Sequence, residues 1–480
     1  MKNTVIAFVI GLILTSFAKA QQKIEWISTT EAKQWELKKN DNLLAASVNN
    51  PDAIVQLGKE QQTIEGFGTC FNELGWTSLA ILKESDRESI MKELFSPKLG
   101  ANFVICRMPV AANDFSLNWY SYNETAGDFK MKNFSIENDK KTLIPFIRSA
   151  LKYNGDLQIW ASPWSPPTWM KYNKHYASKS SMRPGTVKDP KYRNDLPLDR
   201  EGKEGTDGFI QEHKYLKAYA LYFSKFIKGY RDQEIDIDAV MPQNEFNSSQ
   251  VFPSSCWTAK GLSNFVGRYL GPAMNKLDVD LYFGTMERAN EKLVDTVLMD
   301  KKSAKYIKGV GFQWAGKKAL PGINKRYPNL KMYQTEQECG DGKNDWKGAM
   351  YSWDLMKHYL NNGVSVYEYW NTSLLDGGIS RWGWAQNSLV VVDEKKKDYR
   401  YSLEYYLLKH ASHYVMPGAK KIETEGAYGD LLAFKNPDQS VVLIMGNQTD
   451  QNRVVSVKVG DVTISPTLIA NSINTITLKK

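Results

Sequence analysis

Two apolar runs in the second half of the chain each end in a glutamate. The first reads Ala-Val-Met-Pro-Gln-Asn-Glu over residues 239–245, and the second reads Leu-Lys-Met-Tyr-Gln-Thr-Glu over residues 330–336. Two carboxyl groups that face each other can cleave a glycosidic bond, because one protonates the leaving oxygen while the other attacks or supports the anomeric carbon. A single glutamate in such a place is more often a solvated loop residue. Glu245 and Glu336 therefore predict glycoside hydrolysis only if the fold brings them together.

The elements that must position this pair alternate between strands and helices. From about residue 60, short apolar runs rich in β-branched residues alternate with longer segments of helical period. We predict strands at 63–68, 102–109, 157–162, 237–244, 279–285, 307–314, 330–335 and 364–370. We predict helices at 78–95, 143–153, 209–230, 258–277, 290–303, 346–361 and 401–414, and only a short turn around 323–326, where prolines and a glycine interrupt the pattern.

This alternation predicts the α/β class and, within it, a (β/α)8 TIM barrel. The active site of that fold lies at the carboxyl ends of the strands, so the fourth and seventh strands should bring Glu245 and Glu336 to one mouth. Glu338 is the second choice for the place of Glu336, because strand alternation points both to the same face, but it lies further into the loop. A doubly wound open sheet is the alternative, although the glycine-rich phosphate loop that commonly marks that fold is absent.

The chain divides into four expected segments. Residues 1–20 combine Lys2, an apolar run and Ala-Lys-Ala at 18–20, which is typical of a cleaved export signal; an uncleaved N-terminal anchor is the alternative. Residues 61–414 form the barrel. Residues 415–480 have almost no helical period and predict an attached antiparallel β-sandwich domain, to which an N-terminal arm at 21–60 contributes strands. We therefore expect an exported protein, periplasmic or extracellular, with no integral membrane segment after signal cleavage.

The composition is that of a globular protein and excludes several function classes. Of the 480 residues, 42% are hydrophobic and 12% aromatic, which is too apolar for a disordered chain. The formal charge of +9 comes from scattered lysines, so we expect no nucleic-acid partner. The four cysteines are too few for a disulfide scaffold, and we expect free buried thiols, with one bridge as the alternative. The five histidines show no metal-ligand spacing, so we expect chemistry that uses no metal and no cofactor. We also expect a monomer.

Aromatic side chains gather at the predicted mouth. Sugar rings stack on indole faces through their apolar C–H surfaces, so a tryptophan-rich mouth suits a carbohydrate. The tryptophans near the strand ends are Trp164, Trp169, Trp314, Trp370, Trp382 and Trp384. About half of them should belong to the barrel or loop core instead. Arg107 and Asp114, around the end of the second strand, are further candidates, and a surface salt bridge is the alternative for each.

Several short stretches occur in an order that resembles a known family. They are QTIEGFG at 62–68, CRMP at 106–109 with NDF at 113–115, ASPW at 161–164 with PTW at 167–169, QNE at 243–245, TE at 335–336 and YWN at 369–371. In these stretches the chain resembles glycoside hydrolase family 30, the family of acid β-glucosylceramidase and of bacterial and fungal β-1,6-glucanases. The resemblance extends over nearly the whole chain after the signal.

The resemblance implies a retaining double displacement on a (β/α)8 barrel with an attached β-sandwich. Glu245 would be the general acid/base and Glu336 the nucleophile that forms the glycosyl-enzyme intermediate, with the two carboxyl groups ~5–5.5 Å apart. It also implies that Arg107 holds Glu336 ionised and that Asn244 binds the sugar 2-hydroxyl. The residues implied to line the sugar subsite are Asp114, Trp164, Trp370 and Asn371.

Two departures from the glucosylceramidase pattern bear on the substrate. Where those enzymes carry His-Trp-Tyr after the sixth strand, this chain has Gln313-Trp314-Ala315, so a phenol near the nucleophile is missing. The loop at 382–388 also looks more like the microbial branch. We therefore expect cleavage of β-glucosidic linkages, with endo action on β-1,6-glucan first, and a glucosylceramidase or another β-glucosidase or β-xylosidase as alternatives. A non-catalytic glycan-binding protein is the alternative from a different class.

Overall fold

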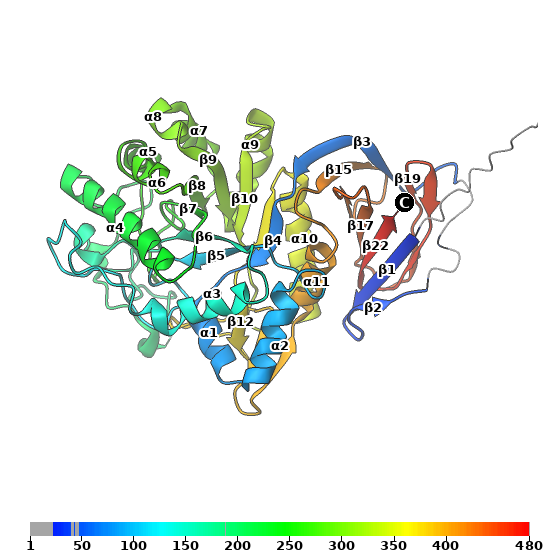
Figure 1. The fold of residues 1–480 in the computed structure, drawn as a ribbon, viewed down its shortest axis with the longest axis horizontal. Coiled ribbons are helices and arrows are strands. Elements are labelled where there is room, and N and C mark those ends of the chain that lie inside the picture. Colours follow the sequence, from blue (N-terminus) through cyan, green and yellow to red (C-terminus); the bar gives the residue numbers. More distant parts are fainter. Residues whose placement is uncertain (1–22, 40–42, 44–47, 188, 480) are drawn as a thin grey trace, which may run out of the picture.

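The computed structural model describes residues 23–39, 43, 48–187 and 189–479. It consists of a barrel surrounded by helices and a β-sheet domain packed against one side of it (Figure 1). The predicted export signal at 1–20 lies outside the described residues.

Eight parallel strands form the barrel and confirm the predicted α/β architecture. Neighbouring strands follow the order β4-β11-β10-β9-β8-β7-β6-β5, so β4 and β5 are the two ends that must meet. They do so through few hydrogen bonds, from Val104 N–H to the Phe67 carbonyl (3.1 Å) and from Phe71 N–H to the Arg107 carbonyl (2.8 Å). The barrel is therefore nearly closed, which excludes the doubly wound open sheet. The strands are β4 (Gly66–Thr69), β5 (Ile105–Pro109), β6 (Gln158–Ser162), β7 (Ala239–Val240), β8 (Asp280–Met286), β9 (Ile307–Gln313), β10 (Lys331–Glu336) and β11 (Val366–Tyr369).

Close backbone approach at this seam requires a glycine. A Cβ atom added to Gly68 would lie 1.5 Å from the carbonyl oxygen of Ile105 and 3.5 Å from Sγ of Cys106. Residue 68 therefore lies where β4 approaches β5 so closely that no side chain fits.

The fourth barrel strand is much shorter than predicted. Residues 237–244 were expected to be extended, but β7 covers only Ala239–Val240. Pro242 has no N–H to donate to a neighbouring strand, and the chain bends after it. Glu245 then adopts a positive φ of 47°. The strand therefore ends early, and the turn that follows it places Glu245 over the barrel.

The helices cover the outside of the barrel, as Figure 1 shows for α4 to α9. The helix predicted at 346–361 is observed with those bounds, whereas the one predicted at 78–95 is two helices. The first of these begins earlier because the side chain of Asn72 accepts a hydrogen bond from Gly75 N–H and caps it. The helices are α1 (Glu73–Ala80), α2 (Glu84–Phe95), α3 (Leu143–Leu151), α4 (His213–Arg231), α5 (Ala259–Phe265), α6 (Gly271–Asn275), α7 (Glu291–Met299), α8 (Lys301–Ala304), α9 (Leu320–Arg326), α10 (Trp346–Asn361) and α11 (Leu403–Ser412).

Two further departures concern helix regularity. The segment predicted as one helix at 258–277 contains a π-helical turn, Val266–Leu270, between α5 and α6. Pro272 lies two residues after this turn, and its ring and missing N–H do not fit a regular α-helical turn, which accounts for the widened one. The short turn predicted around 323–326 is the end of α9, which follows a 3₁₀ turn at Trp314–Ala319.

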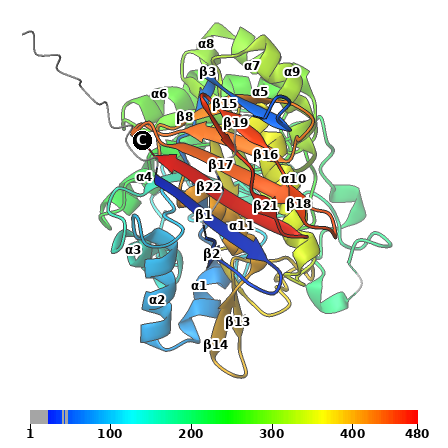
Figure 2. The ribbon, with the colours of Figure 1, turned by 90° about the vertical axis from the view of Figure 1, so that its right-hand side faces the viewer.

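The second domain is a curled mixed sheet built from both ends of the described chain. Figure 2 shows its strands side by side, with β1 next to β22. The sheet order is β2-β1-β22-β17-β16-β15-β3-β19-β20, and β18 pairs with β21. The strands are β1 (Lys23–Thr30), β2 (Glu36–Leu37), β3 (Ala53–Thr63), β15 (Lys420–Glu425), β16 (Leu431–Lys435), β17 (Val441–Asn447), β18 (Arg453–Val454), β19 (Val457–Val459), β20 (Val462–Ile464), β21 (Thr467–Leu468) and β22 (Ser472–Lys479). A smaller sheet in the barrel part contains β12 (Ser373–Leu375), β13 (Val390–Asp393) and β14 (Asp398–Tyr401).

Strand β17 explains how the sheet domain is fixed to the barrel. Successive side chains of a strand point to opposite faces. Leu443 and Met445 belong to the core of the sheet domain, whereas Val442 and Ile444 belong to the same hydrophobic cluster as the barrel. Both faces of this strand are therefore buried, and the two domains share a continuous apolar interface.

Candidate active site

Glu245 and Glu336 lie close together at the carboxyl ends of the barrel strands. The amide nitrogen of Gln313, at the end of β9, donates to Oε1 of Glu245 at 3.1 Å and to Oε2 of Glu336 at 3.2 Å. These two oxygens cannot be further apart than the sum of the two distances. That limit falls below the ~6.5–9.5 Å by which inverting enzymes separate their carboxyl groups. One oxygen of each carboxyl group therefore lies against the same amide, and this close pairing favours a retaining mechanism.

Unusual backbone geometry holds the groups around this pair. Glu245 and Trp314 have φ angles of 47° and 45°, in the left-handed region that few residues other than glycine adopt. The N–H of Glu245 donates to the hydroxyl oxygen of Thr285 at 2.9 Å, which fixes the turn after β7. Strain of this kind is maintained only where the surroundings over-determine it, and it is concentrated at functional sites.

Glu336 accepts hydrogen bonds from three side chains. Trp314 donates through its indole N–H to Oε1 (2.8 Å), while Arg107 (3.1 Å) and Gln313 donate to Oε2. Burial raises the pKa of the Glu336 carboxyl, and these donors, Arg107 foremost, act against that rise because they stabilise the charged form. Glu336 is therefore the carboxyl group of the pair that is better stabilised as an anion.

Glu245 has weaker support for a negative charge. Its Oε1 accepts from Gln313 and its Oε2 accepts from the amide of Gln250 at 3.0 Å, and neither donor is charged. Burial, together with the negative charges of Glu336 and Glu287, raises the pKa of Glu245 well above its usual range. The two carboxyl groups are thereby differentiated, with Glu245 the one that retains its proton to higher pH.

Arg107 organises the floor of the site. Its side chain is fully buried, and its Nη2 donates to Asn244 Oδ1 (2.6 Å) and to the Ser162 hydroxyl (2.9 Å). Its guanidinium carbon lies 4.4 Å from the ring centre of Trp164 and 5.3 Å from that of Trp370. A planar cation against two indole faces is a favourable arrangement, so the aromatic rings help to fix the arginine.

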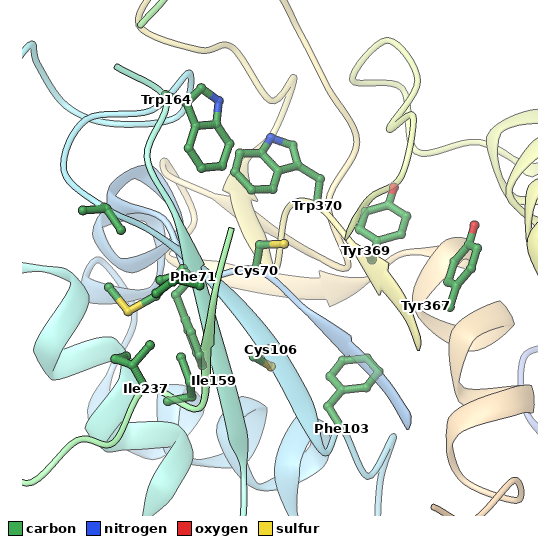
Figure 3. Packing of buried hydrophobic residues seen from close by; sticks show 14 of the residues in the cluster. Cys70, Phe71, Phe103, Cys106, Ile159, Trp164, Ile237, Tyr367, Tyr369 and Trp370 are labelled. Carbon is green, nitrogen blue, oxygen red and sulfur yellow. The ribbon is translucent and has the colours of Figure 1, made fainter. Parts of the chain in front are cut away.

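The predicted sugar-lining residues form a group beside the pair. Trp164 and Trp370 stack with ring centres 5.1 Å apart, and Figure 3 shows them side by side. Asp114 and the indole N–H of Trp370 are both buried and lie within hydrogen-bonding reach of each other. Asn244 uses its carbonyl oxygen for Arg107, Gln313 and Thr285, which leaves its amide N–H groups available. These groups can hydrogen-bond a sugar.

Other predicted residues are engaged elsewhere. Asn371 is fully buried; its amide nitrogen donates to Gln386 (2.8 Å) and its oxygen accepts from Asn72 (3.1 Å), so its polar atoms serve the protein. Trp384 is half-buried and packs on Phe252, with ring centres 5.1 Å apart.

About half of the tryptophans near the mouth were predicted to be core, and Trp169 and Trp382 are buried, as are Trp164 and Trp370. Trp169 donates its indole N–H to the Asn123 carbonyl (2.9 Å) and packs on Phe129, and Trp382 packs on Trp119. Both are buried in the loops around the mouth.

Glu338, the second choice for the nucleophile, is turned away from the pair. It forms an ion pair with Lys317 and accepts a hydrogen bond from the hydroxyl of Tyr351 at 2.6 Å. β10 ends at Glu336, so the strand alternation assumed for residue 338 does not extend that far.

The sequence did not identify the residues that support the pair through loops. Gln250 follows Glu245 by five positions in an irregular loop, and Thr285 precedes the end of β8. No short-range pattern marks Gln250, whereas Thr285 is the last residue of the strand predicted at 279–285 and so lies at a predicted strand end. Gln313 did carry a signal, since it directly precedes Trp314 at the end of the sixth predicted strand.

The described residues include no cluster of three or more histidine, cysteine or acidic side chains that could hold a metal ion. All four cysteines are buried and free, and burial raises the pKa of each thiol. Within the described residues, every helix is too short or too polar to span a lipid bilayer.

Two close, buried carboxyl groups at the mouth of a TIM barrel, beside stacked indoles, are the arrangement of a retaining glycoside hydrolase. Two family models match the chain: the glycosyl hydrolase family 30 TIM-barrel domain over residues 64–194 and 199–415, and the glycosyl hydrolase family 30 beta sandwich domain over residues 418–476. The chain therefore belongs to glycoside hydrolase family 30, a retaining family, as the sequence motifs predicted. Because the members of this family are hydrolases, the alternative of a non-catalytic glycan-binding protein is set aside.

The individual relatives include both glucosylceramidases and β-1,6-glucanases, so they do not decide between these two substrates. The putative glucosylceramidase 1 of Caenorhabditis elegans is 30% identical over 420 residues, which are 82% of this chain and 75% of that one. The endo-1,6-beta-D-glucanase neg1 of Aspergillus fumigatus is 25% identical over 425 residues, 83% of this chain and 81% of that one. Among solved structures, the endo-beta1,6-glucanase BT3312 superposes with a TM-score of 0.78 at 25% identity, covering 95% of this chain and all of that one.

Proposed function

We propose that the protein is an endo-acting β-1,6-glucanase in which Glu245 is the general acid/base and Glu336 the nucleophile. The observation that carries the assignment of roles is the unequal support of the two carboxyl groups. Glu336 accepts from the Arg107 cation and from an indole N–H, whereas Glu245 accepts only from neutral amides. The better-supported anion suits the nucleophile, and the group that retains its proton suits the acid.

The first step forms a glycosyl ester. The protonated Glu245 donates its proton to the glycosidic oxygen while an ionised oxygen of Glu336 attacks the anomeric carbon, so the leaving sugar departs as a neutral alcohol. In the second step Glu245, now a carboxylate, removes a proton from water, which attacks the same carbon and releases Glu336. Two inversions at one carbon restore the original configuration.

Neighbouring groups position the substrate for these steps. Trp164 and Trp370 are fully buried and pack on each other and on Arg107, so they form an apolar wall of the site, while Asp114 and the free amide N–H groups of Asn244 are suited to the hydroxyl groups of a sugar. Hydrogen bonds to a sugar hydroxyl that strengthen in the transition state contribute directly to the rate.

The choice of substrate depends on the residue after Trp314. Ala315 stands where the glucosylceramidase pattern has a tyrosine, so the region beside Glu336 carries a methyl group instead of a phenol. A wider mouth suits a polymeric glucan that extends on both sides of the cleaved bond. The similarity to β-1,6-glucanases over most of both chains supports this choice, while the 30% identity to a glucosylceramidase favours glucosylceramide as the second candidate.

Product analysis on pustulan, a β-1,6-glucan, tests the proposal. Wild type should release a ladder of β-1,6-linked oligosaccharides, and Glu336→Gln should lower turnover by at least about 10³-fold while leaving glucan binding nearly unchanged. In a parallel reaction with glucosylceramide in detergent micelles, cleavage of the lipid without release from pustulan would refute the glucan assignment and establish the second candidate. Proton NMR of the first product formed should show the β configuration, as a retaining mechanism requires.

We also propose that the protein acts outside the cytoplasm. The support is the pattern of residues 1–20, a basic residue followed by an apolar run and Ala-Lys-Ala. N-terminal sequencing of the protein produced in its own cells should begin at Gln21. A chain that retains its first twenty residues and stays with the membrane fraction would indicate an uncleaved anchor.

A further inference from the structure

A large basic groove lies on the outside of the barrel, between α4 and the segment that follows α5. Its volume is about 1130 Å³. The groove is bordered by α4 on one side and by the π-helical turn and α6 on the other. Six cationic side chains line it: Lys130, Lys214, Lys217, Lys228, Arg268 and Lys276. Among the described residues that line the groove, none is acidic.

Most of this positive charge is not neutralised nearby. Lys214 pairs with Glu212 at 3.2 Å, and Arg268 donates to Asn264 and lies within electrostatic reach of Asp300. For the other four cations, the described part of the chain offers no carboxylate within ion-pair distance. A concave surface with one sign of charge concentrates the electrostatic field and attracts ligands of the opposite sign.

The charges follow the period of the helix. Lys217, Leu221, Ser224 and Lys228 are spaced by four, three and four residues, so they share one face of α4. The stretch from residue 217 to residue 228 extends about 16 Å along the helix axis. An extended ligand can therefore contact cations at both ends of the groove and the apolar side chain between them.

Apolar groups line the groove together with the cations. Phe129, Tyr269 and Leu221 are part of its lining, and Leu221 is 37% exposed. Phe129 also packs on Trp169 in the loop after β6, with ring centres 5.4 Å apart, so one end of the groove adjoins the loops around the active-site mouth. Apolar C–H faces and regularly placed anionic groups are what an acidic polysaccharide presents.

We propose that this groove binds an acidic polysaccharide, a glycan chain that carries carboxylate, sulfate or phosphate groups, separately from the catalytic pair. The groove is concave and long, which fits a single chain better than the flat surface of a membrane. Its aromatic rings pack on neighbouring side chains and do not form the row of exposed rings on which nucleic-acid bases stack. Binding here would hold the enzyme on an anionic glycan matrix while the mouth cleaves a glucan.

A charge-reversal experiment tests the groove with a matched control. The groove variant is Lys217→Glu/Lys228→Glu. The control variant is Lys395→Glu/Lys458→Glu, which changes the net charge equally at two exposed positions in the β13–β14 turn and in β19. Binding of end-labelled polygalacturonate and dextran sulfate is measured by fluorescence anisotropy at low and high salt, with labelled dextran as the neutral probe.

We expect wild type and the control variant to bind at least one anionic polymer with affinities within about twofold of each other. The groove variant should bind at least about tenfold more weakly, because each reversal removes an attraction and adds a repulsion. Wild-type affinity should fall with salt, and dextran should not bind. Hydrolysis of a small aryl β-glucoside should be the same in all three proteins, which shows that each is folded and that the catalytic site is separate.

Three results would overturn the proposal. Wild type that binds neither anionic polymer would show that the groove is not a glycan site. Equal losses of polymer binding in the two variants would show that binding depends on the overall charge of the protein and not on the groove. Phosphatidylserine vesicles that bind wild type but not the groove variant, with no binding of either polymer, would identify a membrane surface as the partner instead.

Discussion

Replacing Trp314 by Phe removes a hydrogen-bond donor that serves Glu336 alone. The indole N–H lies 2.8 Å from Oε1 of Glu336 and donates to no atom of Glu245. A hydrogen bond to a charged group contributes ~1.5–3 kcal/mol, and 1.36 kcal/mol corresponds to about one pH unit. Because Trp314 is half-buried and water can replace part of the bond, we expect the pKa of Glu336 to rise by about one unit.

The direction of this change fixes which side of the pH profile moves. With the proposed roles, the active form has Glu336 ionised and Glu245 protonated, so kcat/KM should fall on the acid side as Glu336 gains a proton. A higher pKa for Glu336 therefore moves the acid limb to higher pH and leaves the alkaline limb in place. Gln250→Leu should affect the other limb: it removes a donor that serves Glu245, raises the pKa of Glu245 and moves only the alkaline limb to higher pH.

Gln313→Leu is the matched third variant. Its amide donates to both carboxyl groups, so its loss should move both limbs to higher pH. The assay is kcat/KM from pH 3 to pH 9 on pustulan or an alkyl β-glucoside, since a poor leaving group makes protonation by the acid necessary. Movement of the alkaline limb in Trp314→Phe, or of the acid limb in Gln250→Leu, would refute the assignment of roles to Glu336 and Glu245.

Three further predictions concern residues outside the reacting pair. Glu338→Gln should change kcat/KM on pustulan by less than about twofold, because Glu338 is paired with Lys317; a loss as large as that of Glu336→Gln would contradict the geometry. Gly68→Ala should lower the free energy of unfolding by ~1–3 kcal/mol, measured in urea, because its Cβ would collide with the Ile105 carbonyl. Asp139 is buried among three tyrosine hydroxyl groups, and burial raises its pKa from 3.8 to about 7. The folded protein binds this proton more tightly than the unfolded chain does, so protonated Asp139 adds at most ~4 kcal/mol to the free energy of unfolding below about pH 4. This contribution decreases as the pH rises and is lost by about pH 7. Asp139→Asn should flatten that dependence in urea titrations between pH 4.5 and pH 7.5, and an unchanged slope would contradict the raised pKa.

The parts of the site that follow strand ends were predictable from sequence. Glu336 ends β10, and the position of a strand end in a TIM barrel determines which mouth it faces. Glu245 was found by the same argument, although β7 ends earlier than the pattern indicated. Periodicity detects which residues are apolar, but it does not detect where a proline and a positive φ turn the chain out of the sheet.

The parts that depend on distant contacts were not predictable. Gln250 reaches Glu245 only because of the path of an irregular loop, which no local pattern specifies. Asn371 lies next to Trp370 in sequence, yet its amide is occupied by Asn72 from the loop after β4 and by Gln386. Whether a buried amide serves a ligand or the protein is decided by its partners across the fold.

The pairing of β1 with β22 has a consequence for the order in which the protein is completed during synthesis. β1 aligns with β22 along its full length, from Lys23 opposite Lys479 to Thr30 opposite Ser472. All eight barrel strands emerge from the ribosome before β22 does. The barrel can therefore form while the sheet domain still lacks β22, the strand that joins β1 to β17, and the apolar flank that Val442 and Ile444 cover stays exposed until β17 has been made. A chain that ends before β22 would leave β1 paired only with β2, and one edge of β17 without a neighbouring strand.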